Sequence, residues 1–228
     1  TYVGRVRELA ELGRLFNEGA RLVTLKGTGG AGKTRLSMRY AHGEIHELDG
    51  GAWFVDLTEA RSARGVVHAL STALEVPLSG ADFDGLVTQL GYALAGRGPV
   101  LIVLDNFEQV VQHAEVTVGR WQKMAPQARI LVTSREPLQL SGEQVFPLQP
   151  LSETEAMTLF EIRARSAGAR WVETAEIRSA IKAIVAQLDG LPLAIELAAA
   201  RAAVLAPPQL LDRLTNRFKL LQGGPRGR

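Results

Sequence analysis

The sequence contains no cysteine, and this absence removes several kinds of site at once. Disulfide bonds, cysteine-based metal sites and thiol nucleophiles are all excluded. Runs of about 18 apolar residues, which are typical of transmembrane helices, are also lacking. The first residues, Thr1 to Arg5, show neither an initiator Met nor a signal-peptide pattern. We therefore expect a cytoplasmic location, and we expect the sequence to be a piece of a longer chain.

An excess of charge of one sign is missing as well. The chain has 26 Lys and Arg against 24 Asp and Glu, for a formal net charge of +2, and like charges do not gather in blocks. Such a sequence gives no reason to expect direct contact with nucleic acid or with a membrane. What is present is ordinary for a globular protein: 228 residues, of which 46% are hydrophobic. That length suits one large domain, or one domain with a small appendage.

Strands and helices are expected to alternate in the first two thirds of the chain. Apolar runs predict strands at 21–26, 52–57, 99–104, 128–133 and 144–148, and helical periodicity predicts helices at 6–18, 34–41, 65–74, 83–95 and 109–124. This alternation predicts an α/β fold with a five-stranded parallel sheet and right-handed crossovers.

The pattern changes after Pro150. Only helices are expected from there on, at 154–167, 175–188, 192–204 and 208–214. We therefore predict an α/β domain at residues 1–150, a small helical domain at 151–221 and a linker at 222–228.

One glycine-rich segment carries the strongest functional signal. Residues 27–34, GTGGAGKT, match the phosphate-loop pattern G-x-x-x-x-G-K-[ST] without departure, with a strand before and a helix after. Its glycines allow the backbone to approach phosphate, and its N–H groups form an anion nest at a helix N-terminus. Lys33 is expected to reach the β- and γ-phosphates of ATP or ADP, and the Thr34 hydroxyl to bind Mg²⁺. The predicted nucleotide-binding residues here are Thr28, Gly29, Gly30, Ala31, Gly32, Lys33, Thr34 and Arg35.

A second acidic motif follows a buried strand. The run LIVLD places Asp105 at the carboxyl end of its strand, where open α/β sheets bind their ligands. Asp105 fits the carboxylate that holds Mg²⁺ in phosphate-loop ATPases. An Asp at this position also suits a helix cap, but the phosphate loop upstream favours the metal role.

The residue after Asp105 bears on catalysis. Hydrolysis needs a group that orients or deprotonates the attacking water, and the amide of Asn106 cannot accept a proton. Glu108 is the nearest acid that could act instead, from the first turn of the next helix. It is equally typical of an acid that stabilises a helix N-terminus. The sequence therefore predicts binding that is better than hydrolysis.

A third strand end supplies an arginine. Residues 130–135, ILVTSR, place Arg135 where strand ends converge on a ligand. The fixed charge of an arginine suits recognition of the γ-phosphate. A loop arginine of this kind is otherwise an ordinary surface residue.

These motifs in their order resemble one known family. Val3-Gly4-Arg5, GTGGAGKT, LIVLDN, LVTSR at 131–135 and the Gly-Leu-Pro-Leu run at 190–193 are similar to the NB-ARC-type STAND ATPases. LIVLDNFEQV at 101–110 and LDGLPLAIELAAAR at 188–201 resemble the bacterial transcriptional-regulator branch in particular. The resemblance covers nearly the whole chain.

The resemblance implies further features. The strand at 128–133 should lie between the phosphate-loop strand and the Asp105 strand, as in the ASCE class of P-loop NTPases. Val3 and Arg5 should lie near the adenine and ribose, and Pro192 should pack against one of them. Bound ADP should be the off state, and ATP the on state in which the longer protein self-associates.

Two departures from the family limit what carries over. Asn106 stands where an acid is common in eukaryotic members, which argues against rapid hydrolysis. The winged-helix domain, the effector domain and the ligand-sensing domain of the family are not found in these residues, and none of the four histidines (His42, His46, His68 and His113) fits a family motif.

The leading hypothesis is therefore a regulatory ATP/ADP switch within a multidomain signalling protein. An AAA-type motor or loader acting on protein or DNA is the alternative, since the sequence does not exclude an arginine supplied by a neighbouring subunit. A small-molecule kinase is the third possibility, and it would need a second substrate pocket and a lid.

Overall fold

The computed structural model describes residues 2–80 and 82–222. The chain divides into two compact units, one formed by Arg5–Leu148 and the other by Thr1–Gly4 together with Gln149–Arg228. The predicted linker at 222–228 falls almost entirely outside the described residues, and Gln222 is the last residue of a helix.

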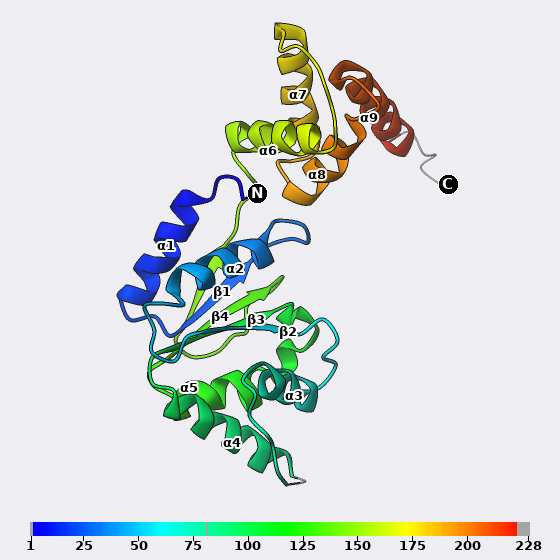
Figure 1. Ribbon diagram of the computed structural model, residues 1–228. Coiled ribbons are helices and arrows are strands. Elements are labelled where there is room, and N and C mark those ends of the chain that lie inside the picture. Colours follow the sequence, from blue (N-terminus) through cyan, green and yellow to red (C-terminus); the bar gives the residue numbers. More distant parts are fainter. Residues whose placement is uncertain (1, 81, 223–228) are drawn as a thin grey trace, which may run out of the picture. The chain divides into compact units, whose positions relative to one another are not determined.

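The first unit is built on a five-stranded sheet (Figure 1). Its neighbouring strands are all parallel, in the order β2-β3-β4-β1-β5. β4 lies between β1 and β3, so the strand order expected from the resemblance is confirmed. The strands are β1 Leu22–Lys26, β2 Ala52–Asp56, β3 Val100–Asp105, β4 Ala128–Ser134 and β5 Glu143–Pro147.

Helices cover both faces of this sheet (Figure 1). α1 and α2 lie on one face, where the rings of Phe16 and Tyr40 stack at 5.7 Å between their centroids. α3, α4 and α5 lie on the other face, where the Trp121 indole is buried and donates a hydrogen bond to the Val87 carbonyl. The helices are α1 Val6–Asn17, α2 Lys33–Glu44, α3 Ala63–Ala73, α4 Phe83–Gly96 and α5 Arg120–Met124.

The alternation of side chains along β3 decides which residues face the phosphate loop. Val100, Ile102 and Leu104 belong to the large apolar core on the α3–α5 side. Successive side chains of a strand point to opposite faces, so Asp105 points to the face that α2 covers. The carboxyl end of β3 thus delivers a carboxylate to the helix that follows the phosphate loop.

The helix predicted at 109–124 is confirmed only in part, because the segment is mostly helical but is not one continuous α-helix. Two short 3₁₀ helices, Phe107–Gln109 and Val111–His113, are followed by a π-helical turn at Glu115–Gly119, and only α5 is α-helical. Val110 between the 3₁₀ helices adopts a φ of −130°, outside the helical range. The apolar residues of this stretch are spaced so that they pack into the core, although the backbone does not form one continuous helix.

The second unit is a cluster of helices (Figure 1). Ser152 begins α6 with a capping box, in which its hydroxyl accepts from the Glu155 N–H and the Glu155 carboxylate accepts from the Ser152 N–H. Pro192 stands at the start of α8, the position that tolerates a missing N–H. The helices are α6 Glu153–Ser166, α7 Ala175–Gln187, α8 Pro192–Arg201 and α9 Pro207–Gln222.

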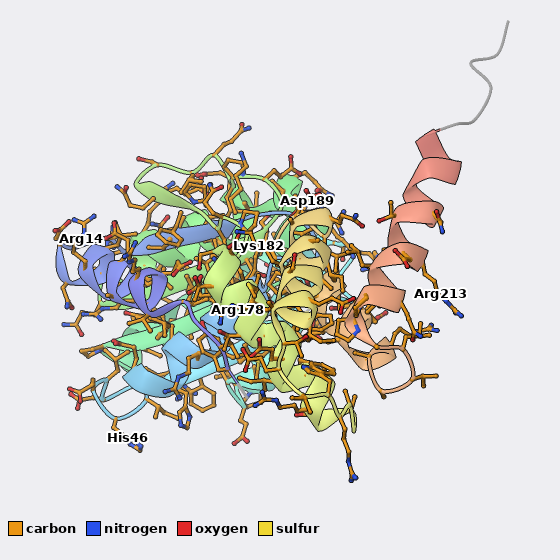
Figure 2. All side chains as sticks on the ribbon, turned by 90° about the horizontal axis from the view of Figure 1, so that it is seen from above. Arg14, His46, Arg178, Lys182, Asp189 and Arg213 are labelled. Atoms are coloured by element: carbon orange, nitrogen blue, oxygen red, sulfur yellow. The ribbon has the colours of Figure 1, made fainter. Side chains whose placement is uncertain are left out.

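A small apolar core, which includes Phe160 and Ile195, holds this unit together. Charged side chains lie outside it: Arg178 and Lys182 project from α7 (Figure 2), and Lys182 pairs with Glu153 at 3.0 Å. Within the described residues, every helix is too short or too polar to cross a membrane.

Candidate functional site

The segment between β1 and α2 has the backbone of a phosphate loop. Gly30 and Gly32 adopt φ values of 78° and 93°, a region that residues with a Cβ rarely enter. The N–H of Gly27 bonds to the carbonyl of Ser134 at 3.2 Å, which ties the start of the loop to the end of β4. The loop therefore begins at the carboxyl end of the sheet and ends at the N-terminus of α2, where an anion is favoured.

Lys33 lies folded over this loop. Its ammonium donates to the carbonyls of Gly27 at 2.8 Å and Thr28 at 3.1 Å, and the residue is only 8% exposed. Burial lowers the pKa of Lys33, and the nearby charge of Glu108 opposes that shift. The ammonium is thus held at the loop by weak acceptors that a phosphate oxygen can replace.

Thr34 and Asp105, the two predicted Mg²⁺ ligands, are in direct contact. The Thr34 hydroxyl lies 3.0 Å from each carboxylate oxygen of Asp105. Thr133, from β4, donates to the same carboxylate at 2.5 Å. Asp105 is 2% exposed, and burial raises its pKa above the usual value while the two threonine hydrogen bonds oppose the rise.

These groups fit a magnesium ion held together with a nucleotide. A cluster of three or more His, Asp or Glu side chains that could hold a metal is absent from the described residues. Mg²⁺ does not need one, because it commonly binds through one or two protein groups, waters and phosphate oxygens. The hydroxyl of Thr34 and the buried carboxylate of Asp105 are oxygen donors of that kind.

Asn106 is turned toward the neighbouring strand. Its backbone is left-handed, with a φ of 62°, and its amide donates to the Thr58 hydroxyl at 2.8 Å. Thr58 in turn donates through its N–H and its hydroxyl to Asp56, the partner of Asp105 in the β2–β3 register. These hydrogen bonds lower the pKa of Asp56. The side-chain amide of Asn106 is thus held by hydrogen bonding to the residues at the end of β2.

Sequence reasoning missed Asp56, Thr58 and Thr133. A signal was present for Asp56, because the run AWFVD ends in an Asp in the same way as LIVLD. Thr133 lies within the quoted motif at 131–135, but only the strand pairing shows that its hydroxyl bonds to Asp105.

Glu108 and Arg135 form an ion pair at the same end of the sheet. The Arg135 Nε lies 3.2 Å from the Glu108 Oε1. Arg135 also lies beside the phosphate loop, since a Cβ built on Gly29 would come 3.4 Å from its Nη2. Glu108 lies in the first turn of a helix, as expected, but that helix is the short 3₁₀ helix Phe107–Gln109. The structure thus brings both residues to the loop that carries Lys33.

The other predicted nucleotide-binding residues are dispersed. Arg5 is 4% exposed and donates to the Ala31 carbonyl of the phosphate loop at 3.2 Å. Arg35 lies exposed on the first turn of α2. Val3 packs against the core of the helical unit, and Pro192 lies at the start of α8 in that same unit. Nucleotide contacts of these four residues stay predictions.

None of the histidines contributes to this group. His42, His46 and His68 are exposed, and Figure 2 shows His46 projecting from the segment after α2. His113 is partly exposed in a 3₁₀ helix.

The geometry agrees with the similarity of the chain to known proteins. A family model described as AAA domain matches residues 16–140. An uncharacterized protein of Mycobacterium tuberculosis is 35% identical over 224 residues, which are 98% of this chain and 56% of that protein. A Mycobacterium tuberculosis protein designated a candidate HTH-type transcriptional regulator is 37% identical over 209 residues, or 91% of this chain and 23% of that protein. The regulatory protein AfsR of Streptomyces griseus is 32% identical, over 89% of this chain and 21% of its own length.

The fold recurs in solved structures of low sequence identity. Cdc6p of Pyrobaculum aerophilum matches with a TM-score of 0.68 and 17% identity, over 99% of this chain and 73% of that one. A STAND protein of Pyrococcus horikoshii with a tetratricopeptide-repeat sensor matches with a TM-score of 0.60 and 18% identity, over 95% and 32%. The α/β unit thus has the P-loop NTPase fold. The chain spans about half the length of the first mycobacterial relative, and a quarter or less of the two named regulators.

Proposed function

The chain belongs to the AAA domain family, and from this membership we propose that it is an ATP/ADP-binding switch module of a signalling or transcription-regulating ATPase. It binds the nucleotide with Mg²⁺, hydrolyses ATP slowly and differs in its interactions between the ATP and ADP states. The finer assignment to the NB-ARC type of STAND ATPase, and a cytoplasmic location, are parts of this proposal.

One observation carries the proposal: the side chains predicted to bind a nucleotide lie together, whereas Asn106, the residue after Asp105, forms hydrogen bonds away from them. Lys33, Thr34 and Asp105 come from two separate motifs and meet at one end of the sheet. Asn106, which follows Asp105, gives its amide hydrogens to the end of β2. A neutral amide held in this way neither accepts a proton nor supplies a carboxylate to the attacking water.

Each residue then has a defined task. Lys33 leaves the carbonyls of Gly27 and Thr28 and pairs with phosphate oxygens, a stronger interaction because both partners are charged. Thr34 and Asp105 hold Mg²⁺, which when bound neutralises part of the charge on the phosphates. Loop N–H groups bind the remaining phosphate oxygens.

The regulatory part of the proposal draws support from the named relatives. One is designated a candidate HTH-type transcriptional regulator and another a regulatory protein, and the matched segment makes up only 23% and 21% of their lengths. We propose that this chain acts within such a longer protein, with linked effector and sensor domains and with self-association in the ATP state. Val3 and Pro192, both in the helical unit, would report the nucleotide to that unit.

The experiment that tests the function is to denature the purified chain, identify the released nucleotide and time its exchange. Stoichiometric ADP that exchanges slowly supports a switch. A protein that purifies empty and releases added ADP within milliseconds supports a motor or a kinase. A protein that binds neither ADP nor ATP contradicts nucleotide binding altogether.

A further inference from the structure

We propose that Glu108 determines how strongly the site prefers ATP over ADP, because it competes with the third phosphate of ATP for the side chain of Arg135. This inference rests on the proposed function, since it concerns the same nucleotide site.

The contact between Glu108 and Arg135 lies beside the phosphate loop. The guanidinium of Arg135 pairs with Glu108 through Nε, at 3.2 Å, and its Nη2 lies against Gly29 of the loop. An arginine donates from five N–H groups fixed in one plane, so the carboxylate of Glu108 at Nε and a phosphate beside Gly29 at Nη2 pull the same cation in different directions. Any anion that enters beside Gly29 must therefore draw Arg135 away from Glu108 or share it.

The two partners differ in how firmly they are held. Phe107, the residue before Glu108, is fully buried, and the Glu108 side chain is 18% exposed. The Arg135 side chain is 67% exposed, so solvent and not packing surrounds most of it. The carboxylate is therefore the fixed member of the pair, and the arginine is the member that can move.

One oxygen of Glu108 is unsatisfied. Its Oε2 is buried and has no hydrogen-bond donor among the described residues. Lys33, whose pKa responds to the charges of both Glu108 and Arg135, is a second cation close to this carboxylate. A buried carboxylate oxygen without a donor is costly, and the charge of Arg135 offsets part of that cost. Glu108 therefore attracts Arg135 more strongly than a fully exposed acid would.

Two alternative roles for Glu108 predict different outcomes. An acid that only stabilises the start of a short helix has no effect on the choice between ATP and ADP. An acid that only repels the third phosphate affects that choice, but does so equally whether Arg135 is present or absent. Competition for Arg135 affects the choice only when Arg135 is there.

A double-mutant cycle separates the three roles. The affinities of ADP and of a non-hydrolysable ATP analogue, both with Mg²⁺, are measured by calorimetry for the wild type, E108Q, R135A and the double variant. The ratio of the two affinities is the readout, so a general loss of folded protein cancels. E115Q is the matched control, since Glu115 pairs with Lys123 at 3.0 Å on the exposed surface of the same segment.

We expect E108Q to raise the preference for the ATP analogue roughly two- to fivefold, the range that a partly exposed ion pair supports. R135A lowers the preference, and adding E108Q to R135A changes it no further. E115Q leaves the ratio at the wild-type value.

A persistent gain from E108Q in the R135A background overturns the proposal in favour of direct repulsion. An unchanged ratio in E108Q overturns it in favour of the helix-end acid. Either result leaves nucleotide binding by the wild type intact, so it is distinguishable from a failure of the proposed function, in which the wild type binds neither nucleotide.

Discussion

Thr34 and Asp105 stand 71 positions apart in the sequence, and in the fold the hydroxyl of the first lies 3.0 Å from both carboxylate oxygens of the second. The contact arises because β1 and β3 flank β4 and all three strands end at the same edge of the sheet. Two oxygen donors taken from separate motifs thus lie side by side, next to the ammonium of Lys33.

Replacing Lys33 by Ala should weaken ADP binding by one to two decades, because a charged hydrogen bond of this kind contributes roughly 1.5–3 kcal/mol. Calorimetry with ADP and Mg²⁺ measures the change. Lys123→Ala is the matched control, since Lys123 is exposed and pairs with Glu115 on the surface. Equal ADP affinity in a folded Lys33→Ala protein would disprove the role of the phosphate loop.

Replacing Asp105 by Asn should remove the effect of Mg²⁺ on nucleotide binding without unfolding the protein. Burial raises the pKa of Asp105 above its unfolded value of 3.8. Its carboxylate therefore destabilises the nucleotide-free fold at neutral pH, whereas below pH 3.8 that cost is absent. The neutral amide should leave the melting temperature equal or higher, while the extra stabilisation that an ATP analogue gains from Mg²⁺ disappears.

Thermal melts with the analogue, with and without Mg²⁺, test this prediction. A ligand at about 100 times its dissociation constant adds roughly 2.7 kcal/mol, which is readily measured. Asp84→Asn is the control, because Asp84 is an exposed acid of α4 that pairs with Arg120. A full Mg²⁺ response in Asp105→Asn would show that the metal is held by other groups.

Replacing Gly190 by Ala should destabilise the helical unit. Gly190 has a φ of 63°, and an added Cβ would lie 2.7 Å from the Leu151 carbonyl oxygen. The left-handed backbone alone costs a residue with a Cβ about 1–2 kcal/mol, and overpacking adds about 1–3 kcal/mol. Urea unfolding followed by circular dichroism should therefore show a loss of about 3 kcal/mol.

Gly168→Ala separates the cost of the left-handed backbone from the cost of overpacking. Gly168, in the same unit, has a φ of 92° but open space around the position of a Cβ. It should lose only the backbone cost, about 1–2 kcal/mol. If the two variants unfold at the same urea concentration, the contact with Leu151 is not what selects glycine at position 190.

Sequence periodicity predicted β1, β2, β3 and β4 because each is a mainly apolar run that ends in a polar residue, whereas β5 is short and only partly apolar. The Gly-rich loop and Asp105 were predictable because each belongs to a short motif that is continuous in the sequence. The breaks in the helix at 109–124 were not predictable, because the apolar residues Val110, Val118 and Trp121 are spaced as in a continuous helix although the segment changes helix type. The hydrogen bond of Asn106 to Thr58 and the pairing of Glu108 with Arg135 join residues 48 and 27 positions apart, so only the folded sheet brings them together.

A single-turnover experiment tests the central claim most directly. The chain, in excess over labelled ATP and with Mg²⁺, is sampled for both bound label and labelled ADP over time. We expect the label to bind and its conversion to be far slower than the typical enzyme rate of about 10 s⁻¹, because losing a positioned base costs about 10²–10⁴-fold. Conversion at a rate approaching that value, or label that never binds, would contradict the central claim.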